Sequence, residues 1–196
     1  MDATKSGDAE TWERGSSGDG AAFALIFDQH RARVFRHAYR LLVDTDDAED
    51  ATAIAFLELW RRRASVRLVD GSVLPWLLVT TTNAARNLTR SRRRYRTLLD
   101  ALPHGEHHRS AEDVALSDEL EDRRLAAALA QLSPTDQHLV TLVMIEGYSP
   151  TDAAPVLGLS AGTTRTKLHR ARTALREHLG HPTLDLYLQS TLGETS

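Results

Sequence analysis

The sequence predicts an all-α protein made of two small helical domains that are joined by an acidic flexible linker. Apolar residues recur at spacings of three and four in almost every periodic segment, and no segment shows a convincing strand-like alternation. Residues 97–122 lose this periodicity and become polar. We therefore expect helical domains at 20–96 and 123–180, a disordered N-terminal tail at 1–19 and a C-terminal tail at 181–196.

The composition excludes several function classes. The chain of 196 residues has no cysteine, which excludes disulfides and thiol chemistry. No run approaches the roughly 18 apolar residues of a membrane span, and the N-terminus lacks the charged-then-apolar order of a signal peptide. We expect a cytoplasmic protein without membrane insertion, metal or other cofactor.

Charge is distributed unevenly along a chain whose formal net charge is only −3. Residues 86–96 hold six arginines and no acid, and residues 160–179 hold five Arg or Lys and one acid. Between these basic blocks, residues 100–122 hold eight acids and one base. Basic clusters on helices most often contact polyanions, although a solvated surface face is the simpler alternative. Two blocks, each at the end of an expected domain, favour nucleic acid.

Three helices are expected in the first domain. The first spans about 20–42 and carries its apolar residues at helical spacing. The second follows the acidic stretch 46–50, because carboxylates stabilise a helix N-terminus, and it ends near the arginines 61–63. The third spans about 74–96 with Pro75 in its first turn, a position that proline favours.

The third helix carries a polar stripe. Six residues are spaced four, three, four, three and four apart and therefore share one face: Trp76, Thr80, Asn83, Asn87, Arg90 and Arg94. Opposite them, Leu77, Ala84 and Leu88 can face the core. An amide stripe that ends in arginines suits base edges exposed by strand opening, with phosphates held alongside. Asn83 taken alone is more simply a surface amide.

Shorter helices are expected in the second domain. LEDRRLAAALAQL forms one of them. Ser133 with Pro134, and Ser149 with Pro150, are two copies of one start signal, in which an N-cap is followed by proline in the first turn. Gly158 is the expected stop of the helix after Ser149.

The last helix begins after Ser160 and is both amphipathic and basic. Its apolar side gathers Leu168, Ala171, Leu175 and Leu179, and roughly opposite lie Arg165, Thr166, His169 and Arg170, with Arg172 and Arg176 flanking. A short helix, a glycine-containing turn and a longer basic helix form the layout of a helix-turn-helix, whose second helix enters the DNA major groove. An amphipathic surface helix in a bundle is the alternative.

Longer motifs resemble one protein family. GYSPTDAAPVLGLSAGTTRTKLHRARTALREHL, residues 147–179, resembles region 4 of the extracytoplasmic-function (ECF, group IV) sigma factors of bacterial RNA polymerase. DDAEDATAIAFLELWRR and PWLLVTTTNAARNLTRSRRR resemble region 2 of that family. The resemblance covers about 20–96 and 123–179, in the family's order. The departures from the family's pattern are Ala53, Ile54, Pro155 and Thr164.

The resemblance implies a promoter-directing sigma factor that binds core RNA polymerase and assists promoter melting, and that is not an enzyme. It implies core contacts at Asp47, Glu49 and Asp50, with Phe56 and Trp60 in the protein core. It implies −10 contacts by Trp76, Asn83, Asn87, Arg90 and Arg94, beside a connector at 66–74 that captures a flipped base. It implies −35 contacts by Arg165, Thr166, Lys167, His169, Arg170 and Arg172.

The expected partners are core polymerase and promoter DNA, and an anti-sigma factor is left open. The resemblance also implies that the acidic linker threads through polymerase channels that otherwise hold nucleic acid, whereas a disordered connector is the simpler interpretation.

Three other interpretations compete with this one. The motif DDAED also fits the magnesium motif of prenyl diphosphate enzymes, but the chain offers no second copy on a suitable long helix. His104, His107 and His108 suggest a metal cluster, but they lie in a polar stretch without a structural frame. The main alternative is a stand-alone helix-turn-helix regulator, which usually binds paired half-sites as a dimer.

Overall fold

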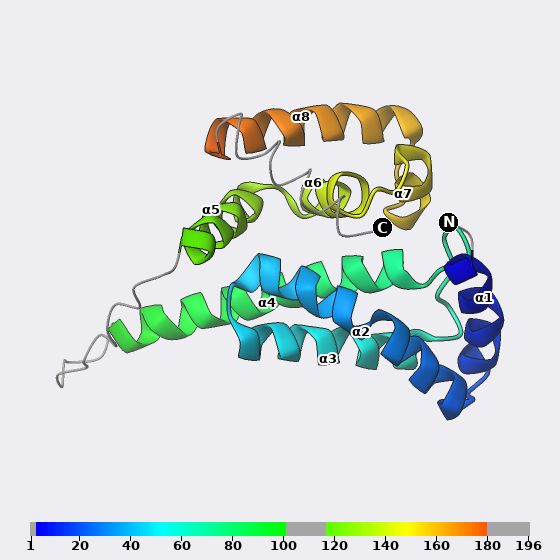
Figure 1. The fold of residues 1–196 in the computed structure, drawn as a ribbon. Coiled ribbons are helices and arrows are strands. Elements are labelled where there is room, and N and C mark those ends of the chain that lie inside the picture. The colour runs from blue at the N-terminus through cyan, green and yellow to red at the C-terminus, as the bar shows by residue number, and fades with distance from the viewer. Residues whose placement is uncertain (1–2, 101–116, 180–196) are drawn as a thin grey trace.

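A computed structural model describes residues 3–100 and 117–179 of the chain (Figure 1). Within these two ranges the backbone is helical apart from its connecting turns and one isolated bridge between Val69 and Ser72. The prediction of an all-α fold is confirmed.

The first four helices pack together at the N-terminal side of the chain. They are α1 (Ala3–Ser16), α2 (Gly20–Leu42), α3 (Thr45–Arg62) and α4 (Leu74–Asp100). Side-chain caps start two of them: Asp19 accepts from the backbone N–H groups of Ala21 and Ala22, and Asp44 accepts from that of Asp47. These bonds satisfy donors that a helix start leaves without a partner, which is why α2 and α3 begin at these positions.

The apolar faces of these helices meet in one core. Ile26 of α2, Leu59 of α3 and Leu77 of α4 are fully buried in it. Phe56 is also buried, and its ring meets that of Phe27 edge-on with 4.7 Å between centroids. Burial of each such side chain contributes about 1.5–3 kcal/mol, so this core dominates the stability of the bundle. Phe56 faces the core, as predicted.

Five helical elements follow at the C-terminal side of the described structure. They are α5 (Ser117–Gln131), α6 (Pro134–Leu139), the π-helix η1 (Val140–Ile145), α7 (Pro150–Val156) and α8 (Ala161–Leu179). The two expected N-caps are present, since the Ser133 and Ser149 hydroxyls accept from the backbone N–H groups of Asp136 and Asp152. Leu129 of α5 and Leu175 of α8 are fully buried in the core of this part.

The two parts pack against one another in the described structure. Leu139, Leu142 and Leu168 join the same hydrophobic cluster as Ile26 and Leu77. Polar bonds flank this cluster. One joins Arg33 of α2 to Glu146, and another joins Arg86 of α4 to the side chain of Gln137, 2.8 Å away. Figure 1 shows α8 lying across the molecule from the long α4.

The structure corrects two boundaries of the sequence-based division. The expected disordered tail at 1–19 contains the helix α1, whose Trp12 is buried in the main core. The expected linker at 97–122 is helical at both ends, because α4 continues to Asp100 and α5 begins at Ser117. Residues 101–116 and the C-terminal tail lie outside the described residues.

Candidate nucleic-acid interfaces

The polar stripe of α4 lies on the surface of the bundle. Asn83, Asn87, Arg90 and Arg94 are exposed, whereas Trp76 and Thr80 at the start of the stripe are half-buried. On the other side of the helix, Leu77, Leu78 and Ala85 are buried. The structure therefore brings the six predicted residues together on one helix face, with two free amides in its middle and cationic side chains toward its C-terminal end.

Packing divides the arginine run of α4 into different roles. Arg92 is 47% exposed, but its guanidinium is held by two carboxylates, 3.1 Å from Asp44 Oδ2 and 2.6 Å from Asp47 Oδ2 on α3. Arg86 is half-buried and donates to the side chain of Gln137. Arg93, Arg94 and their neighbours stay exposed. The sequence predicts one basic block here, because the partners of Arg86 and Arg92 lie on other helices and leave no signal in the local pattern.

The connector before α4 is a compact turn. The backbones of Val69 and Ser72 bond to each other in both directions, at 3.0 and 3.1 Å. Asp70 and Gly71 between them have φ values of 52° and 74°, as in a type I′ turn, which needs residues that tolerate the left-handed region. Arg67 of this connector is exposed, while Val66 and Leu68 pack against the core.

The predicted helix-turn-helix is formed by α7, a turn and α8. Gly158 in the turn has a φ of 64°, a conformation that favours glycine. The Ser160 hydroxyl accepts from the backbone N–H of Thr163 at 3.2 Å and so caps α8. Pro155, which lies inside α7, and Thr164, which is fully buried, are both accommodated without breaking the motif.

The outer face of α8 is basic. Most of the residues predicted to face DNA are exposed: Arg165, Thr166, His169, Arg170 and Arg172. Their helix is held by the buried side chains of Leu168, Ala171 and Leu175, as the periodicity predicts. Lys167 differs, because its side chain turns toward α6, where Nζ lies 3.3 Å from Asp136 Oδ1.

A groove of about 510 Å³ lies between α2 and α3. It is lined by aromatic and charged side chains, among them Phe27, Phe35, Arg31, Arg36 and Glu49. Ile54 and Leu57 of α3 are exposed large apolar side chains, at 40% and 57%. Exposed apolar residues beside mixed charges are typical of a protein-binding surface.

Family profiles match both parts of the chain. The Sigma-70 region 2 profile matches residues 26–95, and the Sigma-70, region 4 profile matches residues 122–175. The chain is 32% identical over 183 residues to the RNA polymerase sigma factor CarQ of Myxococcus xanthus, covering 89% of this chain and 98% of CarQ. It is 31% identical to the ECF RNA polymerase sigma factor SigK of Mycolicibacterium vanbaalenii, covering 83% of this chain and 84% of SigK.

This chain belongs to the ECF sigma factors. It is also 36% identical over 171 residues to the ECF RNA polymerase sigma factor SigE of Mycolicibacterium smegmatis, of which it covers only 65% of the length. Members of this family are transcription initiation factors. The resemblance found in the sequence motifs is therefore confirmed.

Solved structures share the fold of this ECF sigma factor. The structure of CnrH in complex with the cytosolic domain of CnrY aligns with a TM-score of 0.61 and 22% identity, over 97% of this chain and 99% of that one. The sigma factor RpoE of Bartonella quintana, solved with the anti-sigma factor NepR, aligns with a TM-score of 0.53 and 24% identity, over 82% and 98%.

The acidic residues of α3 do not form one exposed set in this sigma factor. Glu49 and Asp50 are exposed, but Asp47 is buried and faces Arg92. Burial raises the pKa of the Asp47 carboxyl, against the lowering effect of the Arg92 charge. The prediction of a surface contact with polymerase does not fit the buried Asp47, and it stays a prediction for the exposed Glu49 and Asp50. Trp60, predicted to lie in the core, is half-buried and meets the Phe23 ring edge-on.

Two features of the described ranges bear on other functions. Within residues 3–100 and 117–179, no three His, Cys, Asp or Glu side chains are grouped to hold a metal ion. His104, His107 and His108 lie outside these ranges. Neither range contains a helix with the length and apolarity that crossing a bilayer requires.

Proposed function

We propose that this sigma factor binds core RNA polymerase, reads the −10 element with α4 and the −35 element with α8, and assists promoter melting. The observation that carries the proposal is the presence of two exposed, arginine-bearing helix faces, one in each sigma region. The chain would act in the cytoplasm, where core polymerase transcribes, and we assign it no catalytic step.

The α4 face suits single-stranded bases. Asn83 and Asn87 each offer a donor and an acceptor that can pair with a base edge. Arg90 and Arg94 follow on the same exposed face and can hold the phosphates of that strand. The half-buried Trp76 and the compact turn before it lie at the other end of the stripe, where a base that leaves the stack would need an apolar surface.

The α8 face suits duplex DNA. Arg165 and Arg170 are exposed, the first in the N-terminal half of α8 and the second at its midpoint. This is the helix that a helix-turn-helix inserts into the major groove. An arginine can donate twice to guanine, whereas Arg172 at the flank suits a phosphate. Lys167 is assigned to the ion pair with Asp136 and drops out of the set of DNA contacts.

The groove between α2 and α3 is the proposed polymerase surface. Glu49 lines it, and the exposed Ile54 and Leu57 lie on the same helix, α3. Apolar anchors surrounded by charges provide both affinity and orientation in a protein interface. The family departures Ala53 and Ile54 belong to this helix, and Ala53 lines the groove. Contacts with polymerase are therefore expected to depend on apolar side chains here.

The acidic segment between the two regions keeps its proposed role in polymerase channels. Its central residues, 101–116, lie outside the described residues, so the proposal rests on charge alone.

A reconstitution tests the proposed function. The full chain is added to purified core polymerase with a library of DNA fragments, and transcript starts are mapped. We expect starts at a fixed distance from a shared pair of sequence elements, and none with core polymerase alone. A stand-alone regulator would bind DNA without core polymerase and would produce no start as the sole specificity factor, and that result would overturn the proposal.

A further inference from the structure

The N-terminal helix α1 carries a carboxylate that is completely buried. Asp8 has no exposed surface, and His30 of α2 is buried beside it. The His30 Nε2 atom lies 3.0 Å from both oxygens of the Asp8 carboxylate. Burying a carboxylate costs free energy unless the carboxylate is paired and hydrogen-bonded. Asp8 therefore needs hydrogen-bond donors in addition to His30.

One further partner belongs to the connector before α4. The backbone N–H of Val73 donates to Asp8 Oδ2 at 3.2 Å, across 65 positions in sequence. Val73 is fully buried, and its carbonyl accepts from Leu77 N–H in the first turn of α4. Asp8 therefore holds the junction where the connector enters α4. Burial alone would raise the pKa of Asp8, but hydrogen bonds from His30, Ser72 and Val73 keep it below its ordinary value.

Hydrogen bonds hold the connector together between residues 69 and 74. A contact at Val73 therefore also fixes the position of the turn before it. Val69 and Ser72 close the type I′ turn, and the Ser72 hydroxyl accepts from Leu74 N–H at 3.1 Å. A hydrogen-bonded turn that is held at one end by α4 and by the buried Asp8–His30 pair has little freedom to move relative to the helix. Trp76, the first residue of the α4 stripe, lies three positions after Val73.

We propose that Asp8 is a positioning residue for recognition of the −10 element, because it holds residues 66–73 of the connector in register with the polar face of α4. This inference rests on the proposed function of that face. It implies that α1 contributes to promoter opening by holding the connector in place. Asp8 touches no DNA in this account and acts only through the Val73 backbone and His30.

The test compares Asp8→Ala with the parent in two measurements. Amide exchange of the isolated chain, well below its unfolding temperature, should quicken on the order of 10-fold across residues 66–73 and not in α8, because one buried acceptor is lost. In the holoenzyme, competition between promoter fragments should show weaker discrimination at −10 positions, with core binding and discrimination at the −35 element retained.

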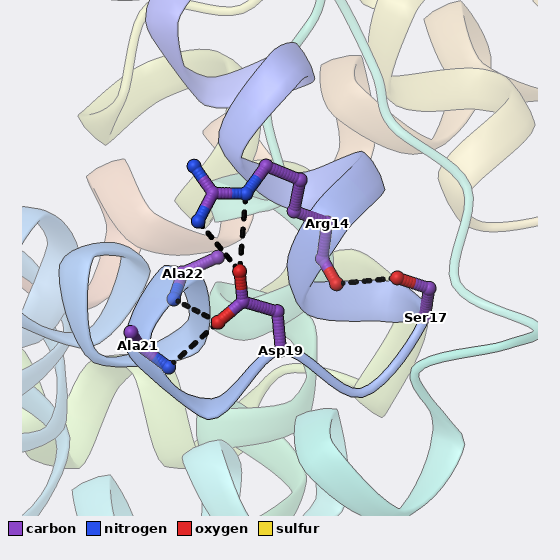
Figure 2. Close-up of polar contacts among 5 residues, drawn as sticks. All are labelled: Arg14, Ser17, Asp19, Ala21 and Ala22. Atoms are coloured by element: carbon purple, nitrogen blue, oxygen red, sulfur yellow. Dashed lines mark hydrogen bonds and ion pairs between the residues drawn. The ribbon is translucent and has the colours of Figure 1, made fainter.

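A matched control is available in the same helix. Figure 2 shows Arg14 near the end of α1 donating to Asp19, which in turn caps α2 at Ala21 and Ala22. The Arg14 Nη2 atom lies 2.6 Å from Asp19 Oδ2, and this pair is exposed. Arg14→Ala removes a bond between α1 and the start of α2 without touching the connector. It should leave both connector exchange and −10 discrimination at parental values.

The outcomes of these measurements separate the proposed function from the positioning role of Asp8. A parent holoenzyme without any −10 preference would overturn the proposed function, and with it the role of Asp8. A parent with that preference, and an Asp8→Ala variant that keeps it in full, would overturn only the positioning role. Where Asp8→Ala fails to fold, Asp8→Asn replaces it, since the amide oxygen still accepts from Val73 while the charge is lost. Asp8→Asn should then show an intermediate loss of −10 discrimination, and parental discrimination would again refute the inference.

Discussion

Arg33 on α2 donates through its guanidinium to the carboxylate of Glu146, which lies 113 positions later in the chain between η1 and α7. The Glu146 side chain is 4% exposed, and Arg40 approaches its other oxygen at 3.9 Å. This contact joins sigma region 2 to sigma region 4. Together with the hydrophobic cluster that Leu139, Leu142 and Leu168 share with Ile26 and Leu77, it packs the two regions against one another.

The first prediction concerns this contact. Glu146→Gln should lower the free energy of unfolding by roughly 1–3 kcal/mol, because the part-buried hydrogen bond from Arg33 and the ion pair with Arg40 lose their charged acceptor. Urea unfolding measures this change, and amide exchange should quicken in η1. Glu58→Gln is the control, since its ion pairs with Arg61 and Arg62 lie at the surface of α3 and contribute little. Equal stability losses in the two variants would contradict a specific role for Glu146.

The second prediction concerns Arg92 and Arg94, which have different roles within the arginine-rich run 86–96 of α4. Arg92→Ala should lower the free energy of unfolding by about 1–2 kcal/mol, because it leaves the buried Asp47 carboxylate without its cation. Arg94→Ala should leave stability unchanged and weaken promoter binding instead, because Arg94 is exposed. Thermal unfolding and fragment binding by the holoenzyme separate the two effects. A loss of stability in Arg94→Ala, together with a loss of promoter binding but not of stability in Arg92→Ala, would refute this division of roles.

The third prediction concerns α8. Arg165→Ala or Arg170→Ala should weaken binding of the −35 element by roughly 1–3 kcal/mol and relax selection at one or two base positions. Arg176→Ala should weaken binding more evenly across sequences, as loss of a phosphate contact does. Lys167→Ala should affect stability more than selection, because its ammonium pairs with Asp136. Selection at the −35 element that is unchanged by both Arg165→Ala and Arg170→Ala would show that another face enters the groove.

Local patterns were sufficient to predict much of the helical framework. The bounds of α2, Gly20–Leu42, agree with the predicted ones, and Ser133 and Ser149 cap helices as expected. Such features depend on residues within one or two turns of each other, so they are visible in the sequence. The exposed stripe of α4 and the apolar side of α8 follow from periodicity in the same way.

The features that the sequence did not predict depend on pairs of residues that lie far apart in the chain. α1 has almost no amphipathic pattern, and it is held by Trp12 and by the Asp8–His30 pair, whose partner lies on another helix. Asp47 and Lys167 carry charges that sequence reasoning placed at the surface. Each is paired with a residue of a different helix, Arg92 and Asp136 respectively. Only the packing of helices shows which charges remain available for DNA or polymerase.

The fourth prediction is a loss of stability in mild acid. His37 is fully buried, and burial, with smaller effects of Arg40 and His138, lowers its pKa to about 3. Burial, with a smaller effect of Arg86, lowers the pKa of His138 to about 4. Since these pKa values lie below the ordinary value of 6.5, the unfolded chain binds protons first as the pH falls.

The stabilisation from neutral His37 and His138 is therefore complete above about pH 6.5 and is lost progressively below it. Between pH 7 and pH 5 we expect a loss of about 2 kcal/mol per histidine, measured by urea unfolding at each pH. His37→Gln should remove about half of this pH dependence, because glutamine does not titrate. An unchanged pH dependence in that variant would contradict the assignment to His37.

The most direct test of the account concerns Asn83, because reading bases in an opened strand separates a sigma factor from other helix-turn-helix proteins. Asn83 is exposed on the side of α4 opposite the buried Leu78 and Ala85, so Asn83→Ala should leave stability and core binding unchanged. The measurement is competition between promoter fragments with single −10 substitutions, for the parent and variant holoenzymes. Asn83→Ala should lose about 1–3 kcal/mol of discrimination at one −10 position, with selection at the −35 element intact. Equal discrimination by both holoenzymes at every −10 position would contradict the role of Asn83 in reading the opened strand.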